Sequence, residues 1–147
     1  NLKLVLEFSD LNKKEQKEKL NTLLDDFSIN HIRKSTAKHL SGGERRRVEI
    51  ARTLILNPDF ILLDEPFAGI DPIAVEDIQN IIKTLKDSGI GILITDHNVR
   101  ETLAITDRSY LIYEGNILKS GTSLELASDP EVKAKYLGQN FKLDTHE

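Results

Sequence analysis

Residues 40–66 read LSGGERRRVEIARTLILNPDFILLDEP and predict one helix followed by one buried strand. The helix is expected to begin at Ser41, whose hydroxyl can cap it while Glu44 bonds back to the same residue. It should end near Asn57-Pro58, because proline disfavours the helical conformation in the residue before it. Phe60 to Leu63 form a continuous apolar run, which is typical of a strand covered on both faces.

The alternation of strand and helix continues to the C-terminus, and this pattern predicts a parallel sheet in an α/β domain. Asp71-Pro72 begins the next helix, since proline is favoured at the first helical position. The expected elements are this helix up to Ser88-Gly89, a buried strand from Ile90 to Thr95, a short helix from Val99 to Ile105, a hairpin of Ser109–Tyr113 with Asn116–Lys119, and two short helices near Ser123–Ala127 and Pro130–Leu137.

The first forty residues are predicted to be helical, except for a turn and loop from Ser28 to His39 anchored by Ile29 and Ile32, and to lie beside the sheet. Leu2, Leu4, Leu6 and Phe8 alternate with other residues, which fits either a short strand or the end of a helix. A helix then begins at Asn12, which stands three residues before Glu15 in a capping box. Its apolar residues recur at helical spacing and are Leu20, Leu23, Leu24 and Phe27.

The composition is that of a globular domain and excludes several classes of protein. The chain has 147 residues, of which 39% are hydrophobic and 30% charged, and a net charge of -4. This charge gives no reason to expect nucleic-acid binding, since such domains are usually basic. No apolar run approaches the ~20 residues that cross a bilayer. Cysteine is absent, which excludes disulfides and thiolate metal sites.

Ser41-Gly42-Gly43-Glu44 supports two readings. The capping box explains Ser41 and Glu44, but it does not explain two glycines in a first helical turn, where each costs about 1 kcal/mol relative to alanine. Glycines there allow another group to approach the backbone closely. Because a helix N-terminus presents unpaired N–H groups, a phosphate is a natural guest. A cap and a phosphate contact remain equally open for this motif.

Two acids follow the first predicted strand directly. Asp64 and Glu65 could be solvated loop acids, with Asp64 acting as a cap. In the functional reading, Asp64 holds Mg²⁺, often through water, and Glu65 takes a proton from, or orients, an attacking water. The second predicted strand ends in the same way at His97, where ligands gather in parallel sheets. His97 could therefore hydrogen-bond a phosphate or orient the water.

These pieces together resemble the ATP-binding cassette (ABC) ATPases. LSGGE matches the family's signature motif, FILLDEP its Walker B segment with the catalytic glutamate, AGID its D-loop, and ITDH ends at its switch histidine. In that family two cassettes pair head to tail and trap ATP between them. The resemblance implies that Ser41, Gly42, Gly43 and Glu44 contact ATP held by the partner subunit, that Asp64 supports Mg²⁺, that Glu65 and His97 are catalytic, and that Asp71 couples the two subunits.

Within the family, the segments ERRRVEIAR, DEPFAGIDPIAV, LITDHNVRETL and VKAKYLGQNFKL resemble the ATPases of lipopolysaccharide exporters, from about Leu2 to Leu143. The resemblance implies an ATPase that forms a homodimer, joins two transmembrane subunits and lies on the cytoplasmic face of the inner membrane. Two alternatives remain open, namely the ATPase of a branched-chain amino acid importer and a truncated interaction module without activity.

The family's phosphate loop, G-x-x-x-x-G-K-[ST], has no counterpart here, because no glycine is followed by lysine. We therefore expect the C-terminal part of a P-loop NTPase domain: part of the helical signature subdomain in residues 1–57, and the second half of the RecA-like α/β core with a helical tail in residues 58–147. We expect this chain alone to be inactive, and its sheet to show an unpaired edge and uncovered apolar surface.

Two features have no predicted role. Arg45, Arg46 and Arg47 cannot share one face of a helix with ~3.6 residues per turn, so at least one of them is expected to be solvated. The packing partner of the tail from Tyr136 to Leu143 is likewise open.

Overall fold

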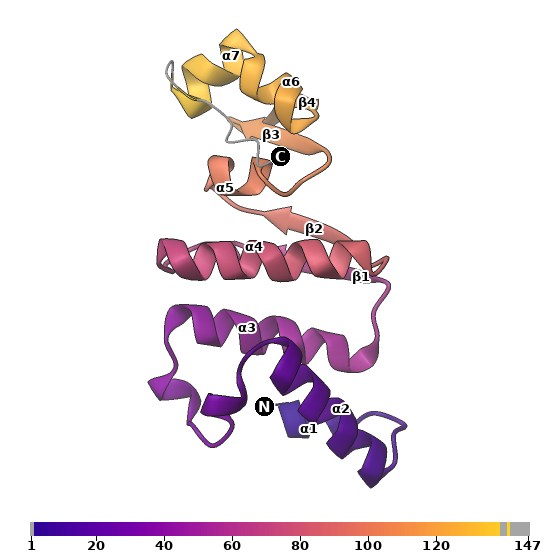
Figure 1. The fold of residues 1–147 in the computed structure, drawn as a ribbon. Helices are drawn as coiled ribbons and strands as arrows, with labels where there is room; N and C mark the ends of the chain where they lie inside the picture. The colour runs from indigo at the N-terminus through magenta and orange to yellow at the C-terminus, as the bar shows by residue number, and fades with distance from the viewer. Residues whose placement is uncertain (1, 139–140, 142–147) are drawn as a thin grey trace.

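The computed structural model describes residues 2–138 and 141 (Figure 1). The end of the predicted tail, up to Leu143, and the last residues of the second predicted unit lie outside this part. The elements in chain order are α1 (Leu2–Leu6), α2 (Lys13–Asp26), η1 (Asn30–Ile32), η2 (Ala37–His39), α3 (Gly42–Thr53), η3 (Leu54–Leu56), β1 (Phe60–Asp64), α4 (Pro72–Asp87), β2 (Gly91–Thr95), α5 (Val99–Leu103), β3 (Ser109–Tyr113), β4 (Asn116–Gly121), α6 (Ser123–Ser128), α7 (Pro130–Val132) and η4 (Lys133–Leu137).

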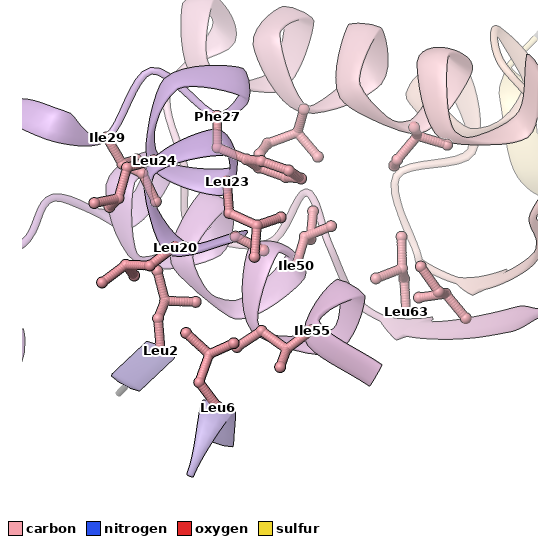
Figure 2. Close-up of a cluster of buried hydrophobic side chains, with 14 of the residues drawn as sticks. Leu2, Leu6, Leu20, Leu23, Leu24, Phe27, Ile29, Ile50, Ile55 and Leu63 are labelled. Atoms are coloured by element: carbon pink, nitrogen blue, oxygen red, sulfur yellow. The ribbon is translucent and has the colours of Figure 1, made fainter. Parts of the chain in front are cut away.

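The N-terminal region is helical, as predicted, and the alternation at its start belongs to helix α1. Helix α2 begins at the predicted capping box: the Asn12 side chain accepts the Glu15 N–H at 3.1 Å, and Glu15 accepts the Asn12 N–H at 2.7 Å. The apolar face of α2 packs against α1 and α3 (Figure 2). The segment before α3 contains two 3-10 turns, and its predicted anchor Ile29 is completely buried.

Helices α3 and α4 lie side by side between the N-terminal helices and the sheet (Figure 1). Helix α3 ends at Thr53 and continues as the 3-10 turn η3 to Asn57, whose φ of 46° closes it directly before Pro58. The predicted end of this helix near Asn57-Pro58 is therefore confirmed. Helix α4 buries Ile78 and Ile82 in the main core, together with Ile50 of α3.

Strands β1 and β2 form a parallel pair, and α4 connects them along the chain. The register runs from Phe60 opposite Gly91 to Asp64 opposite Thr95. Because side chains alternate along a strand, Ile61 points into the core while Phe60 and Leu62 point away, each with 74% of its surface exposed.

The prediction that β1 is covered on both faces is thus wrong for the described residues, since the helices cover one face only. The predicted buried strand β2 likewise has no fully buried residue. On the exposed face, Leu93 of β2 joins Phe60 and Leu62 with 58% of its surface exposed. The uncovered apolar surface that we expected is therefore present. The sheet also contains only these two strands among the residues that the structure describes, so both edges lack a neighbour there.

The predicted hairpin is confirmed: β3 pairs antiparallel with β4, and together they form a sheet separate from that of β1 and β2. A two-residue turn joins them, with φ values of 48° at Glu114 and 77° at Gly115, and so short a loop has a low entropic cost of closure. This hairpin packs with α5, α6 and α7 around a second small core of Leu103, Leu111, Leu126 and Val132. No helix in the described part of the chain is long and apolar enough to cross a membrane.

Candidate active site

The carboxyl ends of β1 and β2 meet at one edge of the parallel sheet. At this edge the Thr95 hydroxyl donates a hydrogen bond to the Asp64 carboxylate. The next residue, Glu65, donates its backbone N–H to the Thr95 carbonyl at 2.7 Å. The strand pairing therefore continues one residue beyond β1 and places Asp64 and Glu65 directly beside the start of the loop that carries His97.

The backbone of Glu65 is held in the left-handed region, with a φ of 46°. This conformation costs a residue with a side chain about 1–2 kcal/mol. Two hydrogen bonds maintain it: the N–H bonds Thr95, and the carbonyl accepts from Arg46 Nη2 of α3 at 2.9 Å. The turn is thus fixed from the sheet on one side and from α3 on the other.

The side chains of Glu65 and His97 lie close together, with 3.4 Å between Oε1 and Nδ1. They are 55% and 67% exposed, respectively. Even between two charged groups, a contact this exposed contributes only about 0–1 kcal/mol to stability, so it does not explain why a strained position carries a glutamate. Chemically, the carboxylate can accept a proton from water, and the imidazole can hydrogen-bond an anion at the same edge.

A third group, Asp96, joins the two loops and was given no role from the sequence. Its side chain is fully buried, although its backbone is partly exposed. One carboxylate oxygen accepts the Phe67 N–H at 3.0 Å and the other accepts the Asn98 N–H at 2.8 Å. Buried carboxylates are costly unless they are hydrogen-bonded in this way. The sequence signal was available, because Asp96 directly follows the predicted strand Ile90–Thr95, just as Asp64 and Glu65 follow the apolar run Phe60–Leu63.

The start of α3 forms a second group, and its predicted capping box is confirmed. The Ser41 hydroxyl accepts the Glu44 N–H at 3.2 Å, and the Glu44 carboxylate accepts the Ser41 N–H at 2.8 Å. Glu44 also lies 2.9 Å from His31 Nε2. The Ser41 backbone bond, followed by the hydrogen bond to His31, lowers the pKa of the Glu44 carboxyl below its ordinary value.

The two glycines of this motif are approached closely by the chain itself. A Cβ atom at Gly43 would lie 2.7 Å from the Ala74 Cβ of α4, and one at Gly42 would lie 3.0 Å from Ile70 Cγ2. Gly43 is buried, whereas Ser41 and Gly42 are exposed. Close packing between α3 and the start of α4 is therefore one reason for glycine here, and the outward-facing Ser41 and Gly42 remain accessible to another molecule.

Asp71, the last of the predicted site residues, caps α4. Its Oδ1 accepts the Ala74 N–H at 3.0 Å, and the residue is exposed. The loop before it contacts the start of α3 through Ile70, so Asp71 belongs to the same surface as Gly42. The structure thus brings Asp64, Glu65 and His97 together at the sheet edge and places Asp71 beside the start of α3.

The three consecutive arginines of α3 point in different directions, as their spacing requires. Arg46 bonds the Glu65 carbonyl and, through Nη1, Glu49 at 2.9 Å. Arg47 forms a partly buried ion pair with Asp77 of α4. Arg45 is exposed, which confirms the prediction that at least one of them is solvated.

A resident metal held by protein side chains alone does not fit this edge. The described residues contain no group of three or more His, Cys, Asp or Glu side chains that could hold a metal ion. Asp64 offers a single exposed carboxylate, which suits a divalent cation whose other ligands are water and substrate oxygens.

Comparisons with known proteins show which proteins this chain resembles. A family model described as ABC transporter matches residues 2–68. The chain is 54% identical over 144 residues to the lipopolysaccharide export system ATP-binding protein LptB of Escherichia coli strain K12, a match that covers 97% of this chain and 60% of that protein. It is 55% identical over 143 residues to an uncharacterized ABC transporter ATP-binding protein of Rhizobium meliloti strain 1021, covering 97% of this chain and 53% of that one.

A solved structure also has this fold. The ADP conformation of an ATP-binding cassette from an ABC transporter superposes with a TM-score of 0.76 and 34% sequence identity, over 91% of this chain and 55% of that one. In each of these matches, the chain spans between a half and two thirds of the other protein's length.

Proposed function

This chain belongs to the ABC transporter family of ATP-binding proteins and has the α/β fold of its cassettes, and from that premise we propose that it forms part of an ATP-hydrolysing transporter subunit. The observation that carries the proposal is the contact between Glu65 and His97, with Asp64 beside them, at the carboxyl edge of a parallel sheet. Ligands of open α/β sheets bind at such edges.

Glu65 and His97 are the proposed catalytic residues for hydrolysis of the terminal phosphate of ATP. The carboxylate of Glu65 orients the attacking water and accepts its proton, because it is exposed and its backbone is fixed by Thr95 and Arg46. The imidazole of His97, 3.4 Å away, hydrogen-bonds the phosphate that is attacked. Catalysis of phosphoryl transfer depends mainly on such positioning and on stabilisation of charge.

Asp64 is the proposed residue that supports Mg²⁺, through water, with the Thr95 hydroxyl orienting its carboxylate. The ion would supply neutralisation of the phosphate charge, which is its general role in phosphoryl transfer. An exposed single carboxylate suits an ion that arrives with its nucleotide.

The start of α3 is proposed to act on the ATP held by a second copy of the subunit. Ser41 and Gly42 are exposed and can reach another molecule, whereas Gly43 is buried against Ala74. Glu44 holds this turn in place through the capping box. Asp71 lies on the same surface and would carry coupling between the two subunits.

The cargo that we propose is lipopolysaccharide, exported from the inner membrane, because LptB is 54% identical over 97% of this chain. The proposed assembly is a head-to-tail dimer of the subunit bound to two transmembrane proteins on the cytoplasmic face of that membrane. Residues 1–57 would belong to the helical subdomain and residues 58–147 to the α/β core. Co-purification of the encoded protein with two membrane subunits tests this assembly, and recovery of it on ribosomes instead would contradict it.

The catalytic proposal is tested by Glu65→Gln in the protein encoded by the complete reading frame. We expect kcat to fall by about 10²–10⁴-fold, the usual contribution of a general base, while ATP binding is retained. Glu76→Gln on the exposed side of α4 is the matched control and should retain full turnover. Unchanged turnover in Glu65→Gln would remove Glu65 from catalysis.

We also propose that this chain by itself does not hydrolyse ATP, because its sequence contains no G-x-x-x-x-G-K-[ST] loop to cradle the triphosphate. Titration calorimetry with MgATP should then detect no stoichiometric binding to residues 1–147. Clear binding of one nucleotide per chain would show that α3 and the Asp64-Glu65 edge suffice as a site.

A further inference from the structure

We propose that Asp96 is a positioning residue that sets the spacing between Glu65 and His97, an inference that rests on the proposed function of those two residues. Asp96 is adjacent to His97 in the chain, and its carboxylate reaches across to Phe67, two residues after Glu65. It therefore touches both loops that carry the catalytic groups.

The Asp96 carboxylate joins two loops that are far apart in the sequence. One oxygen accepts the Asn98 N–H at 2.8 Å and fixes the turn around His97. The other accepts the Phe67 N–H at 3.0 Å and fixes the turn after Glu65. Because Asp96 has no exposed side-chain surface, water cannot replace either bond without opening the loops.

Asp96 does not itself face the position of the reacting groups. Its Oδ1 lies 3.8 Å from His97 Nδ1, beyond hydrogen-bond distance, whereas Glu65 Oε1 lies 3.4 Å from the same nitrogen. The effect of Asp96 on turnover must therefore pass through the placement of Glu65 and His97. A displacement of about 1 Å in such groups can lower a rate by about 10²-fold.

Two substitutions separate the effect of the hydrogen bond to Phe67 from that of the bond to Asn98. Asp96→Asn keeps the shape of the side chain but turns an amide NH₂ toward one of the two N–H donors, so one bond is lost. Asp96→Ser can still accept the Asn98 N–H, as serine does two residues before an amide, but it is too short to reach Phe67. Asp107→Asn, at an exposed ion pair with Lys86, is the matched control for loss of a carboxylate.

The experiment measures kcat per molecule of bound ATP, the ATP dissociation constant, and hydrogen exchange at the Phe67 amide, all in the complete encoded protein. We expect Asp96→Ser to lower kcat by about 10²-fold with an unchanged dissociation constant, and to accelerate exchange at Phe67. Asp96→Asn should do the same where it folds, and Asp107→Asn should leave all three quantities unchanged. Normalising to bound ATP removes molecules that fail to fold.

A residue with a purely structural role would lower thermal stability but leave kcat per bound ATP unchanged, and that result in Asp96→Ser would overturn the inference. A dissociation constant that rises by the same factor as kcat falls would overturn it too, because Asp96 would then act on binding. Glu65→Gln is measured in parallel. If Glu65→Gln retains turnover, the proposed function fails; if it loses turnover while Asp96→Ser does not, only this inference fails.

Discussion

The contact between Gly43 of α3 and Ala74 of α4 can be tested by adding a methyl group at Gly43 and then removing the one at Ala74. In Gly43→Ala the new Cβ would lie 2.7 Å from the Ala74 Cβ, whereas ordinary contact begins at 3.4 Å. To regain ordinary contact, helices α3 and α4 must therefore move apart by about 0.7 Å in this region. Such overpacking costs about 1–3 kcal/mol, and the better helix propensity of alanine returns up to about 1 kcal/mol. We expect Gly43→Ala to lower the free energy of unfolding by about 1–2 kcal/mol.

The double substitution Gly43→Ala with Ala74→Gly moves the methyl group from α4 to α3 and restores the space between them. Urea unfolding of the four proteins in the cycle gives the coupling energy between the two sites, which we expect to be about 1–2 kcal/mol in favour of the swap. Gly42→Ala is the control within the same turn, because its Cβ would lie 3.0 Å from Ile70 Cγ2 and 3.2 Å from the Gly69 carbonyl oxygen, both longer than the 2.7 Å at Gly43, and it should cost less.

A stabilised Gly43→Ala protein would refute this reasoning. If Gly43 were present only to let a phosphate approach, alanine would improve the helix and impair only the activity. Additivity in the cycle within about 0.5 kcal/mol would likewise show that the two residues do not compete for the same space.

Three further predictions concern the strained turn, the ion pair between helices and the capping box. Glu65→Asn, which tolerates a positive φ, should change the free energy of unfolding by less than about 1 kcal/mol in urea while turnover is lost; a large destabilisation would instead assign Glu65 to the fold. Asp77→Ala should cost about 1–2 kcal/mol in the same assay because it leaves the partly buried Arg47 guanidinium unpaired, and a neutral result would contradict that. The pKa of Glu44 is held below its ordinary value of 4.5, so the stability that its ionised form contributes is present above about that pH and is lost as the pH falls through the lower pKa of the folded state. Thermal unfolding between pH 6 and 3 should therefore show a smaller loss of stability on acidification in Glu44→Gln than in the unsubstituted protein.

The features predicted correctly from the sequence depend on residues that are close together in the chain. A capping box needs only residues three positions apart, so Asn12, Ser41 and the start of α4 at Asp71 were all found. The joint placement of Glu65 and His97 also followed, because two parallel strands that end in polar residues must deliver them to the same edge.

The features that were missed depend on distant partners. Asp96 accepts from Phe67, 29 residues away, and no local pattern indicates that bond. An apolar run such as Phe60 to Leu63 shows that a strand can be buried on both faces, but it does not show whether both faces are covered, and Phe60 and Leu62 are not. The neighbour of Gly43 became known only when α3 was placed on α4.

The parallel pairing of β1 and β2 also determines when the edge that carries Glu65 and His97 can form. Glu65 and His97 are 32 positions apart in the chain, and α4 lies between them. At about 5–20 residues per second, a ribosome would add the histidine about 2–6 s after the glutamate. Throughout that interval the nascent chain holds a carboxylate with no imidazole, and until Thr95 is added its second strand is incomplete. Formation of this edge therefore follows closure of the sheet, and a nascent chain that stops before residue 97 lacks the contact between Glu65 and His97.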